Sequence, residues 1–227
     1  MLPCLLSLYS NNRQDMPDRR QFLGMMLMPT LAMAQDDVVL KLPPPQTPRN
    51  TSLVDALKAR KSSREFAEKS LPPGLVSSLL WTAFGVNRPD SGKRTAPSAH
   101  NWQEIDVYAA LPDGMYHYDA AAHALRQTVP GDLRRLTGVQ DFVERAPLNL
   151  VYVANLARMT NASVEDRTFY LAADAGFIAQ NVYLFCASEG LACVVRGLID
   201  RKALAAAMRL RPDQRIVLAQ TVGYPVA

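Results

Sequence analysis

The longest regular pattern of apolar positions lies between Thr168 and Glu189 and predicts a helix. Its apolar residues recur every three or four positions, as on one helical face, and several neighbours widen that stripe. The core positions are Leu171, Ala175, Ile178, Val182 and Phe185, and the widening ones are Ala172, Ala179, Tyr183 and Cys186. We therefore expect little of this helix to face water. Its small residues would let a second helix approach closely.

The same stretch continues into a predicted buried strand. Gly190 is placed to end the helix in a left-handed cap. Residues 191–195 are then nearly all apolar, as in a strand covered on both faces. This strand delivers Arg196 and Gly197 to its C-terminal end.

Elsewhere, shorter patterns alternate between helix and strand without a strict βαβ order. Ser52 caps a predicted helix to Arg60, with Leu53, Val54 and Leu57 as its buried side. Further helices are predicted at 73–84, 132–137, 140–144 and 201–208, and strands at 105–111, 115–118, 124–128, 148–154 and 216–222. Residues 87–99 are predicted to form a polar loop. The mixture favours an α+β fold with a central mixed or antiparallel sheet flanked by helices.

The N-terminus has the pattern of an export signal. Asp18-Arg19-Arg20-Gln21-Phe22-Leu23 resembles a twin-arginine motif, an apolar stretch follows, and Ala32-Met33-Ala34 fits a cleavage site. The alternative is a basic helix, and Met16 is an alternative start. We interpret residues 1–34 as the signal, 35–50 as a proline-rich leader and 51–227 as the folded domain, located in the periplasm. Without the signal, the expected location is the cytoplasm.

Composition limits the possible partners. Of the 227 residues, 48% are hydrophobic and 20% are charged, which is typical of a globular protein. A net charge of +4 without a basic block gives no support for nucleic-acid binding, and no apolar run is long enough to span a membrane. The three histidines lack metal-ligand spacing, so no metal site is predicted. Cys186 and Cys193 fit buried apolar positions better than a disulfide, which an oxidising compartment would allow.

Three clusters could carry chemistry. The segment from Arg60 to Arg64 offers cations and hydroxyls that suit a phosphate, although cations also stabilise the C-terminus of a helix. The run from Arg94 to Gln103 offers amides and hydroxyls for a flat polar ring, or for ordinary turns. At Arg196-Gly197, the glycine would let a ligand approach the backbone. Each cluster alone is weak.

In this order, the clusters resemble the nitroreductase family of flavoproteins. Arg60 to Phe66 is similar to the family's R-x-S-x-R/K-x-F motif, and Pro97 to Gln103 to its P-S-x-x-N-x-Q loop. Residues 190–197 and 222–225 are similar to its late strand and its closing V-G-x-P. The runs 94–99 and 116–119 are similar to the azoline-oxidase (SagB-type) branch. The resemblance covers about residues 52–225.

The resemblance implies a homodimer with the long central helix at its interface and one FMN at each subunit boundary. It implies that Arg60, Lys61, Ser62 and Arg64 hold the phosphate and ribityl chain, and that Gly197 places its N–H near flavin N5. Pro97, Ser98, Asn101 and Gln103 would approach the ring from the partner subunit. The chain departs from the family by ending soon after V-G-x-P, so Arg196 is a candidate extra cation, at the phosphate or near the flavin ring.

The resemblance further implies an FMN-dependent oxidoreductase that transfers hydride to or from a small molecule in a ping-pong cycle. The flavin carries the redox chemistry, and no protein acid or base is predicted. NAD(P)H is the family's usual electron donor, but export would separate the protein from it. The alternative function is an exported FMN-binding accessory protein without turnover of its own.

Overall fold

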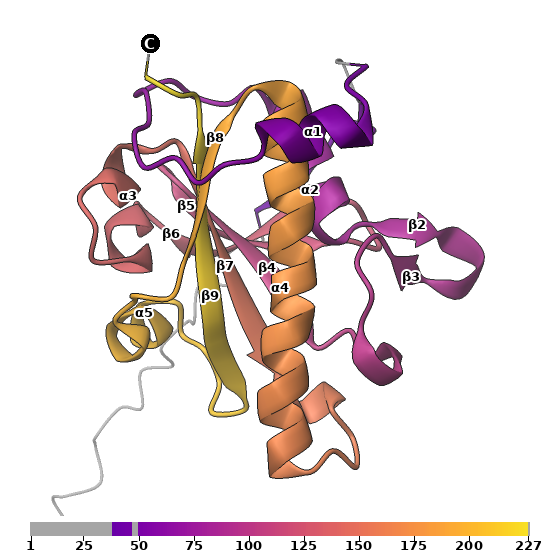
Figure 1. Ribbon diagram of the computed structural model, residues 1–227. Helices are drawn as coiled ribbons and strands as arrows, with labels where there is room; N and C mark the ends of the chain where they lie inside the picture. The colour runs from indigo at the N-terminus through magenta and orange to yellow at the C-terminus, as the bar shows by residue number, and fades with distance from the viewer. Residues whose placement is uncertain (1–37, 47–49, 227) are drawn as a thin grey trace, which may run out of the picture. The chain divides into compact units, whose positions relative to one another are not determined.

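A seven-stranded sheet organises the computed structural model, which describes residues 38–46 and 50–226 (Figure 1). The strand order is β1-β6-β5-β4-β7-β9-β8, and every pair of neighbouring strands in this sheet is antiparallel. The strands are β1 (Val39–Lys41), β4 (Ile105–Leu111), β5 (Gly114–Asp119), β6 (Ala124–Pro130), β7 (Leu148–Asn155), β8 (Ala192–Arg196) and β9 (Gln214–Gly223). The predicted α+β fold with a central sheet is confirmed, and the sheet is antiparallel rather than mixed.

Helices cover both faces of this sheet. They are α1 (Leu53–Ala59), α2 (Pro73–Phe84), α3 (Phe142–Arg145), α4 (Val164–Glu189) and α5 (Arg201–Ala207), with short 3-10 turns η1 (Pro89–Ser91), η2 (Ala99–Asn101), η3 (Arg134–Thr137) and η4 (Leu156–Arg158). α2 and α4 pack on one face, and α5 packs on the other. The central strands are therefore apolar on both sides: in β4, Val107 and Ala109 face α4 while Tyr108 and Ala110 face α5.

The long helix α4 has the predicted ends and core face. The Ser163 hydroxyl accepts a hydrogen bond from the Asp166 N–H at its start, and Gly190 (φ 70°) ends it in a left-handed cap. All five predicted core positions are buried. The prediction that little of the helix faces water is wrong, because Ala172, Gly176 and Phe177 are exposed. Nothing lies within 4 Å of a Cβ placed on Gly176, so α4 presents a partly apolar, small-residue face outward.

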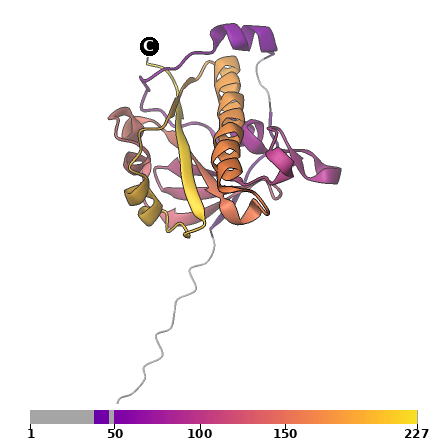
Figure 2. The ribbon, with the colours of Figure 1, turned by 60° about the horizontal axis from the view of Figure 1, so that its bottom comes forward.

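The first helix, α1, buries a different side from the one that the sequence predicted. Leu53, Val54 and Leu57 are 65%, 58% and 50% exposed, and Ala56 is the buried position. The reason is that α1 is only two turns long and packs near the C-terminal end of α4, where Thr51 Oγ1 donates to the Ser188 carbonyl at 3.1 Å (Figures 1 and 2). Its apolar side consequently points away from the sheet.

Two other segments are more ordered than predicted. Part of the proline-rich leader forms β1, which adds an edge strand beside β6. The predicted polar loop at 87–99 contains a hairpin of β2 (Val86–Arg88) and β3 (Lys93–Arg94), which projects from the domain in both views (Figures 1 and 2). The predicted export signal lies outside the described residues.

In the part of the chain that the structure describes, no helix is long and apolar enough to cross a membrane.

Candidate functional site

The Arg60–Arg64 cluster follows the first helix as an extended segment. α1 ends at Arg60, whose backbone (φ −57°, ψ 120°) leaves the helical region. The chain then runs beside β8, with the Ser63 N–H donating to the Cys193 carbonyl at 2.9 Å. Lys61, Ser62 and Arg64 are exposed on this segment. The cluster is therefore fixed to the sheet edge while its polar side chains remain accessible.

Tyr183 connects this segment to the end of β8. Its hydroxyl lies 2.8 Å from the Ser62 hydroxyl and accepts the Val195 N–H at 2.9 Å. The Arg60 guanidinium lies over its ring, 5.4 Å from the centroid. Because Val195 is two residues before Gly197, the first and third clusters belong to one region of the subunit.

The donors of the first cluster fit a phosphate. Arg60, Lys61 and Arg64 form no salt bridge and no side-chain hydrogen bond with any residue that the structure describes. Three unmatched cations beside a serine hydroxyl are the forked, positive donor set that a phosphate requires. A cavity of about 420 Å³ adjoins them, lined in part by Lys61, Ser63 and Tyr183.

Gly197 leaves room for a ligand next to the backbone. It is exposed, and an added Cβ would meet only Leu218 Cδ2, at 3.9 Å. The protein's own packing therefore does not fill the space beside this residue. An open backbone position at the end of β8 suits the close approach of a flat ring.

Arg196 points to the other side of the sheet and is buried. Its Nε donates to Thr221 Oγ1 at 3.0 Å, Nη1 to the Thr137 carbonyl at 2.8 Å and Nη2 to Asn149 Oδ1 at 3.0 Å. Burial lowers its pKa to about 10, which leaves it charged at neutral pH. All three nitrogens connect the η3 segment to the sheet. Arg196 is therefore not one of the residues that could bind a phosphate.

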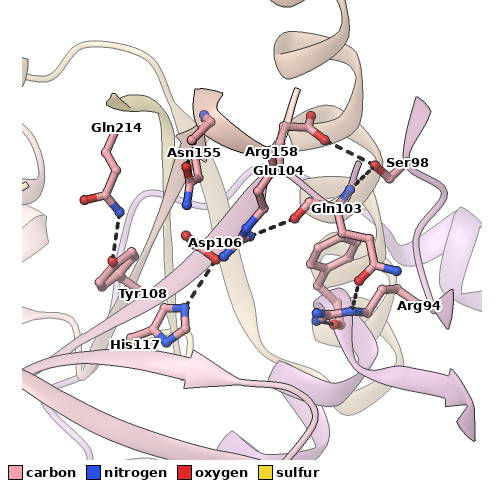
Figure 3. Close-up of polar contacts among 12 residues, drawn as sticks. Arg94, Ser98, Gln103, Glu104, Asp106, Tyr108, His117, Asn155, Arg158 and Gln214 are labelled. Carbon is pink, nitrogen blue, oxygen red and sulfur yellow. Dashed lines mark hydrogen bonds and ion pairs between the residues drawn. The ribbon is translucent and has the colours of Figure 1, made fainter. Parts of the chain in front are cut away.

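The loop from Pro97 to Gln103 is a strained but well-bonded segment (Figure 3). His100, Asn101 and Gln103 have φ of 50°, 55° and 48°, which non-glycine residues rarely adopt. The Ser98 hydroxyl accepts the Gln103 N–H at 2.8 Å and donates to Glu104 Oε2 at 3.2 Å. These bonds hold Pro97 and Asn101 in exposed positions.

Two buried carboxyl groups support this loop, and the sequence analysis did not identify either of them. Asp174 Oδ2 accepts the Ala99 N–H at 2.9 Å, and Glu104 is fully buried. Burial, and then the charge of Asp174, raise the pKa of Glu104 to about 7. Glu104 Oε1 has no hydrogen-bond partner among the described residues. The available signal was Asp174 itself, an acid in the middle of the buried stripe of α4, one turn from Leu171 and Ile178.

One subunit does not bring the three clusters together. The loop is attached to α4 at Asp174, whereas Ser62 and β8 are attached at Tyr183, nine residues further along. At 1.5 Å per residue, this separates the two attachments by about 14 Å along the helix. Within one subunit, the loop and the other two clusters are therefore attached to different parts of α4.

Neither of the two cysteines in the described part of the chain is in a disulfide. Cys186 and Cys193 are free and buried, as favoured by the sequence, and Cys193 Sγ accepts a hydrogen bond from Gln220 Nε2 at 3.0 Å. Burial raises the pKa of the Cys186 thiol. Within residues 38–46 and 50–226, no group of three histidine, cysteine or acidic residues is arranged to hold a metal ion.

Comparisons with known proteins agree with this geometry. The model of the nitroreductase family matches residues 57–224. A protein of Methanocaldococcus jannaschii, provisionally named a nitroreductase, is 33% identical over 156 residues, which cover 64% of this chain and 78% of the relative.

Two solved structures share the fold. One is a provisionally assigned nitroreductase of Ralstonia eutropha JMP134, with 47% identity, a TM-score of 0.80 and coverage of 83% of this chain and 90% of that one. The other is the NADPH:FMN oxidoreductase of Vibrio harveyi in complex with NAD+, with 18% identity, a TM-score of 0.58 and coverage of 77% and 69%. At that identity it supports the fold alone. The chain belongs to the nitroreductase family of flavin-dependent oxidoreductases.

Proposed function

We propose that two copies of this chain form a homodimer that binds one FMN at each subunit boundary and transfers hydride between small molecules. The observation that carries the proposal is the set of three unmatched cations, Arg60, Lys61 and Arg64, joined through Tyr183 to the open Gly197. A phosphate at one end and a flat ring at the other match the two ends of FMN.

The residues of one subunit would bind the phosphate and one edge of the ring. Arg60, Lys61 and Arg64 would neutralise the phosphate, and Ser62 would donate to it or to the ribityl chain. The Gly197 N–H would face flavin N5. As the family resemblance implies, the second flavin would be contacted across the interface by four loop residues: Pro97, Ser98, Asn101 and Gln103.

When bound, the flavin supplies two-electron chemistry, accepting hydride from a donor and passing it to an acceptor in separate half-reactions. The chain's own task is to hold and orient the ring and to limit water around it. NAD(P)H is one candidate donor. The strained loop at 98–103 is suited to positioning, because its hydrogen bonds to Glu104 and Asp174 come from buried groups.

Support for the dimer comes from exposed apolar surface on two neighbouring helices. Leu53, Val54 and Leu57 on α1 and Phe169 and Phe177 on α4 are all at least 48% exposed. Exposed clusters of this kind commonly mark protein–protein contacts. Ala172 and Gly176 on the same side of α4 would let the two long helices cross closely.

The test is turnover of the purified, desalted protein. We expect a yellow protein that a reductant bleaches under anaerobic conditions and that a nitroaromatic or a quinone restores, with repeated cycles once a donor is present. Comparing NADH, NADPH and non-nicotinamide reductants identifies the donor class. A protein that retains FMN but supports no cycle with any donor would favour the accessory alternative. A protein that binds no flavin would contradict both.

We also propose that the protein is exported to the periplasm through the twin-arginine motif at Arg19-Arg20. Export after folding suits a protein that must first bind a cofactor. Replacing Arg19 and Arg20 together with lysine should retain the full-length protein in the cytoplasm. Cell fractionation with an antibody measures this, and unchanged distribution of the double variant would refute the signal.

A further inference from the structure

A second cavity, of about 520 Å³, opens where β5 separates from β4. β4 pairs with β5 only from Tyr108 onward, whereas Ile105–Val107 pairs with β7 alone. The cavity is lined at this fork by Arg94, Trp102, Asp106, His117, Tyr118 and Arg158. None of these residues belongs to the phosphate cluster.

The carboxylates in this cavity already have cationic partners (Figure 3). Asp106 Oδ1 accepts from Arg158 Nη1 at 2.8 Å and lies 3.3 Å from His117 Nε2. Asp119, which also lines the cavity, pairs with Arg126 at 2.9 Å. The remaining arginine, Arg94, forms no salt bridge with any of the described residues. Of the two arginines that line the cavity, Arg94 is therefore the one without a carboxylate partner among the described residues.

Arg94 is held in place by neutral groups. Its Nε donates to Gln103 Oε1 at 2.9 Å, and Nη1 donates to the Phe84 carbonyl at 3.0 Å. The guanidinium lies over the Phe84 ring, 4.9 Å from its centroid. Nη2 has no acceptor within residues 38–46 and 50–226. A fixed, half-buried guanidinium with a free nitrogen is preorganised to bind an anion.

The surroundings of Arg94 make an anion favourable. Burial lowers the pKa of Arg94 and the positive charge of Arg158 also lowers it, while Tyr118, Asp106 and Asp119 raise it. A bound anion would stabilise the charged guanidinium against the cost of its burial. The walls include three aromatic side chains, Phe84, Trp102 and Tyr118.

We propose that this cavity binds a small aromatic carboxylic acid, with Arg94 as the main partner of its carboxylate and the aromatic side chains around its ring. One guanidinium without a carboxylate partner matches a single carboxylate better than a phosphate, which carries more charge. The volume is sufficient for a one-ring acid. That the acid is also a substrate rests on the proposed function, because Trp102 and Gln103 belong to the loop proposed to contact the flavin.

Calorimetric titration of the flavin-loaded protein with benzoate tests the binding site. Benzamide, which has the same shape without the charge, is the neutral comparison. We expect benzoate to bind more tightly than benzamide, and Arg94→Gln to weaken benzoate about ten- to a hundredfold, since charged hydrogen bonds of this kind contribute about 1.5–3 kcal/mol. Lys93→Gln is the matched control, because it removes the same charge from the neighbouring exposed position.

A second variant covers the case in which Arg94→Gln does not fold. Ala121 is exposed and lines the cavity, so Ala121→Phe narrows the space while leaving Arg94 in place. Loss of benzoate binding in this variant supports the site. The proposal is overturned if benzoate binds no better than benzamide, if Arg94→Gln binds benzoate as the parent does, or if Ala121→Phe leaves binding unchanged.

Turnover measurements test whether the bound acid is also a substrate, separately from whether it binds in the cavity. In Arg94→Gln, we expect the fall in kcat/KM to be at least tenfold larger for 4-nitrobenzoate than for nitrobenzene. An equal fall for both acceptors overturns the substrate assignment. Failure of the parent protein to reduce either acceptor contradicts the proposed function, whereas the benzoate titration still decides the binding site.

Discussion

The hydroxyl of Tyr183 lies 2.8 Å from the hydroxyl of Ser62 and accepts the N–H of Val195 at 2.9 Å. One buried side chain of the long helix thus connects the segment proposed to bind phosphate with the strand that presents Gly197. The two ends of the proposed flavin site are therefore positioned by a single group. Removing that group should loosen both.

Tyr183→Phe is expected to lower the free energy of unfolding by about 1–3 kcal/mol, because the Val195 N–H loses its acceptor. It should also reduce the fraction of protein that purifies with flavin, although the ring and its contact with Arg60 remain. Denaturant unfolding and the flavin absorbance per subunit measure the two effects. Tyr170→Phe is the control, since the Tyr170 hydroxyl has no hydrogen bond among the described residues. Equal behaviour of the two variants would refute the connecting role.

Arg60→Ala and Arg64→Ala are each expected to weaken FMN binding about ten- to a hundredfold, the value of a charge-assisted hydrogen bond. Neither side chain forms a hydrogen bond or salt bridge with the described residues, and Arg60 contacts only the Tyr183 ring, so the fold should remain intact. Circular dichroism checks the fold, and fluorescence titration of the apoprotein with FMN gives the affinity. Lys58→Ala removes an exposed cation of α1 outside the cluster and should have no effect. If both arginine variants retain full flavin, the phosphate assignment is wrong.

The sequence predicted most elements of the domain because their patterns are local. The apolar stripe of α4, Gly190 at its C-terminal end and the apolar strand β8 depend on neighbours in the chain. The direction of α1 could not be predicted in this way. Its apolar residues Leu53, Val54 and Leu57 are typical of a buried face, and only their exposure in the subunit shows that something else would have to cover them.

The sequence predicted those site residues that a motif specifies by residue type. It could not predict interactions in which the partner residues come from distant segments of the chain. Arg196 had a suitable type and position, but Thr137, Asn149 and Thr221 occupy its nitrogens from three other parts of the chain. Tyr183 looked like part of an apolar stripe, and its two hydrogen bonds depend on the tertiary fold. The cofactor roles and the resemblance to the azoline-oxidase branch stay predictions.

Gly176→Leu is expected to produce a folded monomer without flavin. Nothing lies within 4 Å of a Cβ at this position, and leucine favours a helix more than glycine does, so the subunit itself should tolerate the change. A leucine would, however, keep a second helix from approaching closely. Ala179 is a poor site for the same test, because it is buried in its own subunit.

Light scattering and flavin absorbance report the outcome for Gly176→Leu. Gly74→Leu is the matched control, since Gly74 is an exposed glycine of α2 that also has open space around it. We expect that variant to remain dimeric and yellow. A parent protein that is monomeric with stoichiometric FMN would refute the shared site and the roles of Ser98 and Asn101.

The buried Glu104 predicts a specific pH dependence of stability. Its pKa rises from 4.5 to about 7 on folding, so between these values the folded state binds more protons than the unfolded state. The contribution of Glu104 to the free energy of unfolding should therefore be largest below about pH 4.5 and be lost as the pH rises toward 7. The shift corresponds to a loss of about 3 kcal/mol. Ionisation would place two charges, Glu104 and Asp174, together behind Ser98 and Ala99.

Glu104→Gln keeps the shape of the side chain and removes its titration. We therefore expect the stability difference between the parent protein and Glu104→Gln to move by about 3 kcal/mol in favour of the variant between acidic and mildly basic pH. Urea unfolding over this range measures the difference, and Glu65→Gln, at an exposed position, should run parallel to the parent. If Glu104→Gln also runs parallel, the pKa of Glu104 is not raised in the folded protein and Glu104 is ionised at neutral pH. The loop at Ser98 would then have to be held against two negative charges rather than one.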